Sequence, residues 1–181
     1  MNKILVLAGP SGSGKSTIEK YAKEHCRYVP IVSATTRTPR VNEVQGKSYW
    51  FHSHYNFLKK VVNNEFVEYA MYNEEFYGVL RSELEEKLKM GNVVCVLESI
   101  GAHKMLELYP NETVVVVIDL PNEMLKERMI ARKDDLGAIE KRLSLIEDMR
   151  RDLEDISTNV VINDGTIEET WEKIENLIKL S

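Results

Sequence analysis

Cysteine, long apolar runs and excess positive charge are all scarce in this sequence. Its 181 residues include two cysteines, Cys26 and Cys95, too few for a disulfide framework or a zinc site. The longest apolar runs have five residues, far short of the roughly 20 that a membrane-spanning helix needs. The first residues lack the length and cleavage site of a signal peptide, and the net charge of −5 gives no global basic field for nucleic acid. We therefore expect a cytoplasmic protein that engages neither a membrane nor nucleic acid.

No repeat, low-complexity stretch or Pro/Gly-rich linker divides the chain. Its hydrophobic fraction of 43% and charged fraction of 29% are ordinary for a soluble globular protein and exclude a disordered chain. A length of 181 residues corresponds to about one domain and is sufficient to bury a core. We therefore predict a single domain over residues 1–181.

Apolar runs alternate along the chain with stretches of helical character. The runs at residues 4–8, 93–97 and 114–118 are continuous, as in strands buried on both faces of a parallel sheet, and a shorter run follows at 160–162. Helices are predicted at residues 16–26, 82–90, 102–108, 122–131, 139–156 and 167–180. Before the last one, Thr166 and Glu169 have the spacing of a capping box. Strand followed by helix, repeated, predicts an α/β fold with a parallel sheet.

Two segments interrupt this alternation. Residues from about 33 to 81 are rich in Thr, Tyr, Phe and Val, and predict a small mixed α/β region inserted into a core of residues 1–32 and 82–181. Inserted regions of this kind often carry the substrate site. A polar stretch from about 131 to 138, between two helices, is a candidate lid. The charged residues from Glu83 to Lys89 are interpreted as a solvated helix face.

The strongest motif follows the first apolar run and fits the pattern G-x-x-x-x-G-K-[ST]. It comprises Gly9, Pro10, Ser11, Gly12, Ser13, Gly14, Lys15, Ser16 and the adjoining Thr17. Its glycines allow backbone N–H groups to turn toward a phosphate, and the following helix directs its positive end to the same anion. We expect Lys15 to reach the β and γ phosphates of ATP, and the Ser16 hydroxyl to bind Mg²⁺. The short chain, without a clear N-K-x-D motif, favours a small-molecule kinase.

A second group of basic residues lies in the segment 33–40. Arg37 and Arg40 fall within four residues of each other on a chain stiffened by Pro39. A guanidinium group can bind two phosphate oxygens at once. Taken alone, the segment predicts either an anion pocket separate from the glycine-rich motif or a solvated basic loop.

Further segments complete an ordered set of motifs. They are residues 65–70 (EFVEYA), 76–78 (FYG), 127–128 (ER), 141–143 (KRL) and 160–164 (VVIND). Together with residues 9–17 and 33–40, they resemble the motifs of guanylate kinases, in order, over nearly the whole chain. The resemblance implies a P-loop kinase core that transfers the γ-phosphoryl group of ATP to GMP or dGMP in purine nucleotide metabolism, with Mg²⁺ as cofactor. We expect a monomer or a homodimer.

On the acceptor side, the resemblance assigns roles to residues of the inserted region. Those that would hold the phosphate of GMP or line its pocket are Ser33, Arg37, Arg40, Tyr49 and Tyr77. Glu68 would accept hydrogen bonds from N1 and N2 of guanine. Adenine has an acceptor at N1 and no 2-amino group, so it would leave the Glu68 carboxylate unpaired.

On the donor side, the resemblance places three arginines, Arg128, Arg132 and Arg142, against the transferring phosphoryl group, as catalytic residues together with Lys15. Charge in phosphoryl transfer spreads over peripheral oxygens, so cationic side chains and Mg²⁺ do most of the work. The alternative for the arginines is ion pairing on helix surfaces. Asn163 would lie near the adenine of ATP or serve as a turn residue.

Two positions depart from the usual family pattern. Where the family has Ser or Thr after Tyr77-Gly78, this chain has Val79, which has no hydroxyl to offer guanine. One neutral hydrogen bond contributes about 0.5–1.5 kcal/mol, so we expect weaker acceptor binding without loss of function. The family also usually has two acidic residues separated by one position. Here Val96 occupies the first position and Glu98 the second. Glu98 would contact guanine or organise Mg²⁺ through water.

Two other functions match parts of the sequence. Residues 77–79 (YGV) and 102–103 (AH) are also similar to ribose 1,5-bisphosphate phosphokinase, which lacks Glu68 and the full 33–40 pattern. Guanylate-kinase-like domains also serve as protein-binding modules, but these tend to lose the phosphate loop, whose Lys15 and Ser16 are present here. GMP is therefore the predicted acceptor.

Overall fold

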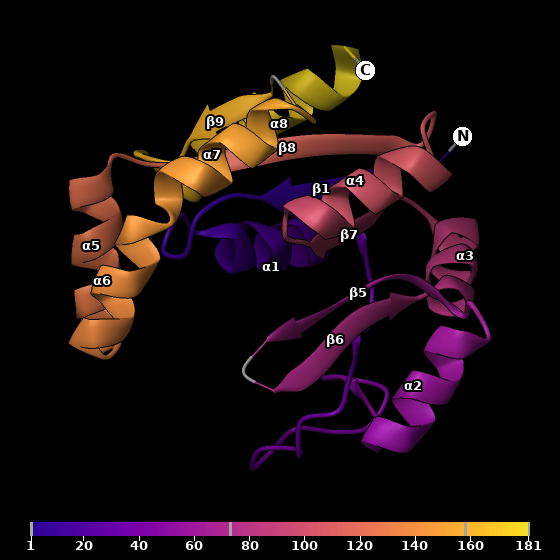
Figure 1. Cartoon of the computed structure of the whole chain (residues 1–181). Helices are drawn as coiled ribbons and strands as arrows, with labels where there is room; N and C mark the ends of the chain where they lie inside the picture. The colour runs from indigo at the N-terminus through magenta and orange to yellow at the C-terminus, as the bar shows by residue number, and fades with distance from the viewer. Residues whose placement is uncertain (1, 73, 158, 181) are drawn as a thin grey trace.

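The computed structural model describes residues 2–72, 74–157 and 159–180. Its core is a five-stranded parallel sheet in the order β2-β7-β1-β8-β9 (Figure 1). The strands are β2 (Val29–Pro30), β7 (Val93–Val96), β1 (Ile4–Ala8), β8 (Thr113–Asp119) and β9 (Val160–Ile162). The central strands β1 and β8 are buried along their whole length, which is why their sequences are continuous apolar runs.

Helices cover both faces of this sheet, so alternate strand residues belong to two hydrophobic clusters. One face packs against α1 (Lys15–His25) and α8 (Ile167–Leu180). The opposite face packs against α3 (Arg81–Met90), α4 (Ser99–Leu108) and α7 (Ile146–Glu154). The predicted capping box before α8 is confirmed, because Thr166 and Glu169 each accept the other's backbone N–H. Among the residues described, none of the helices has the length and apolar character needed to cross a membrane.

A second sheet, in the order β4-β3-β6-β5, mixes parallel and antiparallel pairs. It contains β3 (Ala34–Thr35), β4 (Trp50–Phe51), β5 (Phe66–Tyr72) and β6 (Glu75–Leu80), with α2 (His54–Val62) beside them. The ring of Phe57 in α2 stacks between Phe66 and Phe76 to fill a small core. Val67 and Val79 join the cluster under α4, so the two sheets share apolar contacts. The predicted α/β class, a parallel sheet with a second mixed region, is confirmed.

The single helix predicted over residues 139–156 is wrong. Two helices, α6 (Leu136–Ser144) and α7, occupy this stretch and meet at Leu145. There the Ser144 hydroxyl donates to the carbonyl of Lys141 at 2.8 Å, and the Leu145 N–H donates to the carbonyl of Arg142. Such side-chain competition and three-residue spacing tighten the last turn and end a helix. The limits predicted for the insertion and for the lid, which follows α5 (Asn122–Ala131), stay predictions.

The charged helix face predicted from Glu83 to Lys89 is wrong at its first residue. Glu83 is buried, with 7% of the residue surface exposed, whereas Glu85, Glu86 and Lys89 are exposed. A carboxylate is buried only where hydrogen bonds compensate for lost water. Glu83 therefore has structural partners that its local sequence does not reveal.

Candidate functional site

The glycine-rich segment forms a tight loop between the end of β1 and the start of α1. At Gly9, φ is +128°, and a Cβ atom would overlap the carbonyl of Ile118 on β8. At Gly14, φ is +100°, and a Cβ atom would overlap the side-chain nitrogen of Asn163. Both positions require glycine for conformation and for space. The loop therefore lies at the carboxyl edge of the sheet, where open α/β folds bind their ligands.

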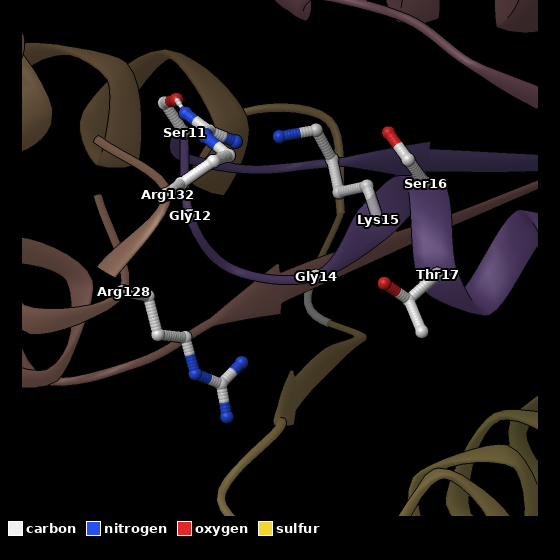
Figure 2. Close-up of a pocket in the computed structure, with 8 residues that line it drawn as sticks. All are labelled: Ser11, Gly12, Gly14, Lys15, Ser16, Thr17, Arg128 and Arg132. Atoms are coloured by element: carbon white, nitrogen blue, oxygen red, sulfur yellow. Dashed lines mark hydrogen bonds between the residues drawn. The ribbon is translucent and has the colours of Figure 1, made fainter. Parts of the chain in front are cut away.

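A pocket of about 310 Å³ opens over this loop (Figure 2). Its lining consists of Ser11, Gly12, Gly14, Lys15, Ser16, Thr17, Arg128 and Arg132. Six of these come from the predicted ATP-binding set and two are predicted catalytic arginines. The positive end of α1 and three cationic side chains suit the pocket to a polyphosphate.

Lys15 extends over the loop that carries it. Its Nζ donates to the carbonyl oxygens of Gly9 at 2.5 Å and Pro10 at 2.8 Å. Burial lowers the pKa of the Lys15 ammonium, and the nearby carboxylate of Glu98 partly raises it again. The side chains of Lys15 and Arg132 point toward one another in Figure 2. An anion between them would contact two cations.

Asn163, predicted near adenine or in a turn, is buried and hydrogen-bonded to the loop. Its Nδ2 donates to the carbonyl of Ser13 at 2.7 Å, and its Oδ1 accepts from the hydroxyl of Thr170 in α8 at 2.9 Å. Its backbone carbonyl accepts from Arg128 Nη2 at 2.9 Å. Asn163 thus ties the phosphate loop to α8 and to a predicted catalytic arginine.

The structure brings Arg132 and Arg142 together through a carboxylate that sequence reasoning missed. Asp134 accepts from Arg132 Nε at 3.0 Å and from Arg142 Nη1 at 2.7 Å. The Arg132 side chain, 54% exposed, also reaches the Ser11 hydroxyl at 3.3 Å. Hydrogen bonding to Arg132 is the main cause that lowers the pKa of Asp134. The only local signal was the polar run that contains Asp134.

Three predicted phosphate ligands of the acceptor, Arg37, Tyr49 and Tyr77, gather at one end of the second sheet. The Arg37 guanidinium lies 5.4 Å from the centre of the Tyr49 ring, and the Tyr49 and Tyr77 rings are 6.1 Å apart. Arg37 also forms a two-pronged ion pair with Glu43, at 2.8 and 3.0 Å. This ion pair is the main cause that lowers the pKa of Glu43, which sequence reasoning missed. Arg40 is exposed, and its backbone N–H donates to Glu43.

Glu68 lies on β5, where the second sheet meets α4. A Cβ atom at Gly101, in the first turn of α4, would lie 3.1 Å from Glu68 Oε2. Burial raises the pKa of the Glu68 carboxyl to about 7, opposed by a hydrogen bond to the backbone of Val79. The Val79 side chain is fully buried in the hydrophobic cluster shared by the two sheets. Glu98 is exposed at the start of α4 and makes no side-chain cap there.

Within the described ranges, no group of three or more His, Cys, Asp or Glu side chains could hold a metal ion. His54 lies 3.5 Å from Glu75, whereas the Nε2 of His52 is buried without a hydrogen-bond partner. Mg²⁺ at nucleotide sites is commonly held by substrate phosphates and one or two protein oxygens. The Ser16 hydroxyl on the pocket wall and the Glu98 carboxylate near Lys15 fit that mode of binding.

A buried parallel sheet, a glycine-rich loop at its carboxyl edge and a cationic pocket define a P-loop phosphate-binding protein. Comparison with known proteins narrows this class. The sequence model of the guanylate kinase family, described as "Guanylate kinase", matches residues 1–181. The chain belongs to the guanylate kinase family.

Individual relatives carry the same name. The chain is 38% identical over 143 residues to a guanylate kinase of Helicobacter pylori, covering 77% of this chain and 69% of that protein. It is 34% identical over 178 residues to a guanylate kinase of Clostridium acetobutylicum, covering 97% and 84%. Among solved structures, guanylate kinase from Anaplasma phagocytophilum superposes with a TM-score of 0.75 at 30% identity, covering 99% of this chain and 85% of that chain. The similarity therefore includes both sheets.

Proposed function

We propose that the chain is a guanylate kinase that transfers the γ-phosphoryl group of ATP to GMP or dGMP, giving ADP and GDP. The observation that carries the proposal is the position of the two predicted sites near the same end of α4. Glu68 approaches the first turn of α4, and Glu98, at the start of α4, interacts electrostatically with Lys15. A base on Glu68 and a triphosphate on Lys15 would therefore lie at the same end of α4.

On the donor side, residues 9–17 would bind the phosphates of ATP through backbone N–H groups and Lys15. Ser16 would hold Mg²⁺, with Glu98 nearby, and Asn163 would lie at the ATP site. Bound Mg²⁺ would neutralise phosphate charge and orient the γ-phosphoryl group. The cationic lining of the pocket supports this assignment.

On the acceptor side, the phosphate of GMP would bind to Ser33, Arg37, Arg40, Tyr49 and Tyr77. Glu68 would accept the N1–H and N2–H donors of guanine, a pair that adenine lacks. These donors favour the ionised carboxylate, whose pKa in the free protein is about 7. Val79 supplies no hydroxyl to the base, so Glu68 would carry most of the discrimination.

In the reaction, an oxygen of the GMP phosphate would attack the γ-phosphorus of ATP in line. The bond from that phosphorus to the β–γ bridging oxygen would break, and its electron pair would leave with ADP. Arg128, Arg132 and Arg142 would stabilise charge on the peripheral oxygens, and the segment near residues 131–138 would close over the substrates. Positioning and charge neutralisation supply the rate, with no covalent intermediate.

The two alternative functions are not favoured. The family match over residues 1–181 and the named relatives support a nucleotide acceptor over ribose 1,5-bisphosphate. The loop that a binding module tends to lose is intact, with Lys15 and Ser16 on the pocket wall.

A coupled assay of ADP release tests the proposal. The protein is incubated with Mg·ATP and, separately, GMP, dGMP, IMP, AMP, UMP, CMP or ribose 1,5-bisphosphate. Turnover dominated by GMP and dGMP is expected. Turnover with ribose 1,5-bisphosphate alone would show that this compound, and not GMP, is the acceptor. No turnover with any of the seven compounds, combined with no ATP or GMP binding in calorimetry, would favour the binding module.

A further inference from the structure

Glu83 occupies the junction where the chain returns from the second sheet to the core. It lies in the first turn of α3, directly after β6. Its side chain is buried while its helix neighbours Glu85 and Glu86 are exposed. Because a buried carboxylate must be compensated, its partners identify what it stabilises.

The Glu83 carboxylate joins three segments that are distant in sequence. Oε1 accepts from the backbone N–H of Val32 at 3.2 Å, and Oε2 accepts from the indole Nε1–H of Trp50 at 3.2 Å. Lys87, one turn later in α3, places its Nζ 3.9 Å from Oε1. The positive end of α3 also favours the negative charge at this position. Glu83 thus links the connection between β2 and β3, strand β4, and α3.

Trp50 extends this link to the acceptor site. Its backbone N–H donates to the carbonyl of Ser33 at 2.8 Å. Its indole ring packs closely on Gly46, whose N–H donates to the carbonyl of Tyr49 at 2.9 Å. Ser33 and Tyr49 are both proposed to hold the acceptor phosphate. The position of Trp50 is therefore linked to two parts of that site, through its backbone to Ser33 and through its indole ring to the backbone that binds Tyr49.

We propose that Glu83 is a positioning residue for the acceptor phosphate site, a role that rests on the proposed function. By binding Val32 and the Trp50 indole, it holds residues 32–50 against α3 in the geometry that places Tyr49 beside Arg37. It touches no substrate. None of these contacts reaches the phosphate loop, so losing them should weaken binding of the acceptor and leave binding of ATP unchanged.

Glu83→Gln tests this role with the smallest change in shape. The glutamine NH₂ would face the N–H of either Val32 or Trp50, which leaves one donor without an acceptor. We expect the KM for GMP to rise about tenfold, while kcat and the KM for ATP change by about twofold or less. Glu86→Gln, which removes the same charge from an exposed position of α3, is the matched control and should leave both KM values unchanged. Equal rises in the two KM values would contradict the proposal.

Trp50→Phe provides a second variant that keeps a ring on Gly46 and removes the indole donor. It should also raise the KM for GMP. In the double variant with Glu83→Gln, the loss should be smaller than the sum of the single losses, because phenylalanine has no N–H to oppose the glutamine amide. Additive losses would show that Glu83 does not act through Trp50.

A spectroscopic readout separates this role from the proposed activity. The chain has two tryptophans, so Trp171→Phe leaves Trp50 as its single indole. In that background, Glu83→Gln should shift Trp50 emission to longer wavelength and increase its quenching by acrylamide. Unchanged emission would overturn the positioning role even if the parent protein turns over GMP. The expected emission change in a parent that does not turn over GMP would contradict the proposed function instead.

Discussion

The phosphate loop and the acceptor site are built in different ways. The loop is a continuous segment, residues 9–17, whose shape depends on backbone conformation at Gly9 and Gly14. The proposed acceptor site collects side chains from several strands and loops. Carboxylates bind residues in or beside it, Glu43 to Arg37 and Glu83 to Trp50. A site made from backbone tolerates few substitutions in one segment, whereas a site made from side chains depends on partners scattered over the chain.

The largest expected effect comes from removing the one charge that the loop itself supplies. Lys15→Met should lower kcat/KM by at least about 100-fold, because the phosphates of ATP lose a preorganised cation in a partly dehydrated pocket. Steady-state kinetics with Mg·ATP and GMP measure the loss, and circular dichroism checks the fold. Activity near that of the parent would show that Lys15 does not act on the phosphates of ATP.

The second effect should fall on the acceptor alone. Glu68→Gln should weaken GMP binding about 10- to 100-fold while sparing ATP binding, because the amide opposes one of the two guanine donors. Calorimetric titration with GMP and with ATP, each alone, measures the two affinities. Equal losses for both nucleotides would show that Glu68 supports the fold and does not read the base.

Glu68 also predicts a dependence of stability on pH. Burial raises the pKa of its carboxyl to about 7 in the folded protein, above the unfolded value of about 4.3. Between these values the folded state binds more protons than the unfolded state, so the free energy of unfolding falls as pH rises. The contribution is on the order of 1–3 kcal/mol.

Urea unfolding at pH 5 and pH 8, without nucleotide, measures this contribution. Glutamine does not titrate, so Glu68→Gln should gain stability relative to the parent between pH 5 and pH 8. Parallel pH dependence in the two proteins would contradict a raised pKa at this position.

A smaller effect is expected where a side chain supports the backbone-defined site. Asn163→Ala removes the donor to the Ser13 carbonyl and the acceptor of Thr170. We expect the KM for ATP to rise about tenfold with little change in the KM for GMP. Ser157→Ala, which removes a buried hydrogen bond to Val115 on the same sheet, is the control for general destabilisation. A matching rise in the KM for ATP in that control would mean that the effect is not specific to the loop.

The smallest effect is expected at the ion pairs that Asp134 forms near the surface. Asp134→Asn weakens its contacts to Arg132 and Arg142, whose side chains are 54% and 35% exposed. The melting temperature should change by about 2 °C or less, because ion pairs in contact with solvent contribute little. Thermal unfolding followed by circular dichroism measures the change, and a much larger fall would show that Asp134 holds the helices themselves.

The same contrast explains what the sequence predicted. The phosphate loop, the central strands and the capping box of α8 depend on neighbouring residues, and all were identified from local patterns. The prediction that Glu83 is exposed is wrong because its partner Val32 lies 51 positions away in the sequence. Nothing near Glu83 in the sequence distinguishes it from the exposed Glu85. The break at Leu145 was missed because the apolar pattern continues across it, and a serine hydroxyl decides the helix end.

The Arg37–Glu43 pair has a consequence for how an acceptor would enter. A phosphate that takes the Nη1 and Nη2 donors of Arg37 would displace the carboxylate of Glu43, which now accepts from both, so binding would be an exchange of one anion for another. The guanidinium would stay paired throughout, and the measured affinity would be the difference between two similar interactions. Such an exchange gives a weaker dependence on ionic strength than capture of a phosphate by a free arginine would give. The Glu43 carboxylate would also compete with the acceptor phosphate for Arg37, and it would pair with Arg37 again as GDP departs.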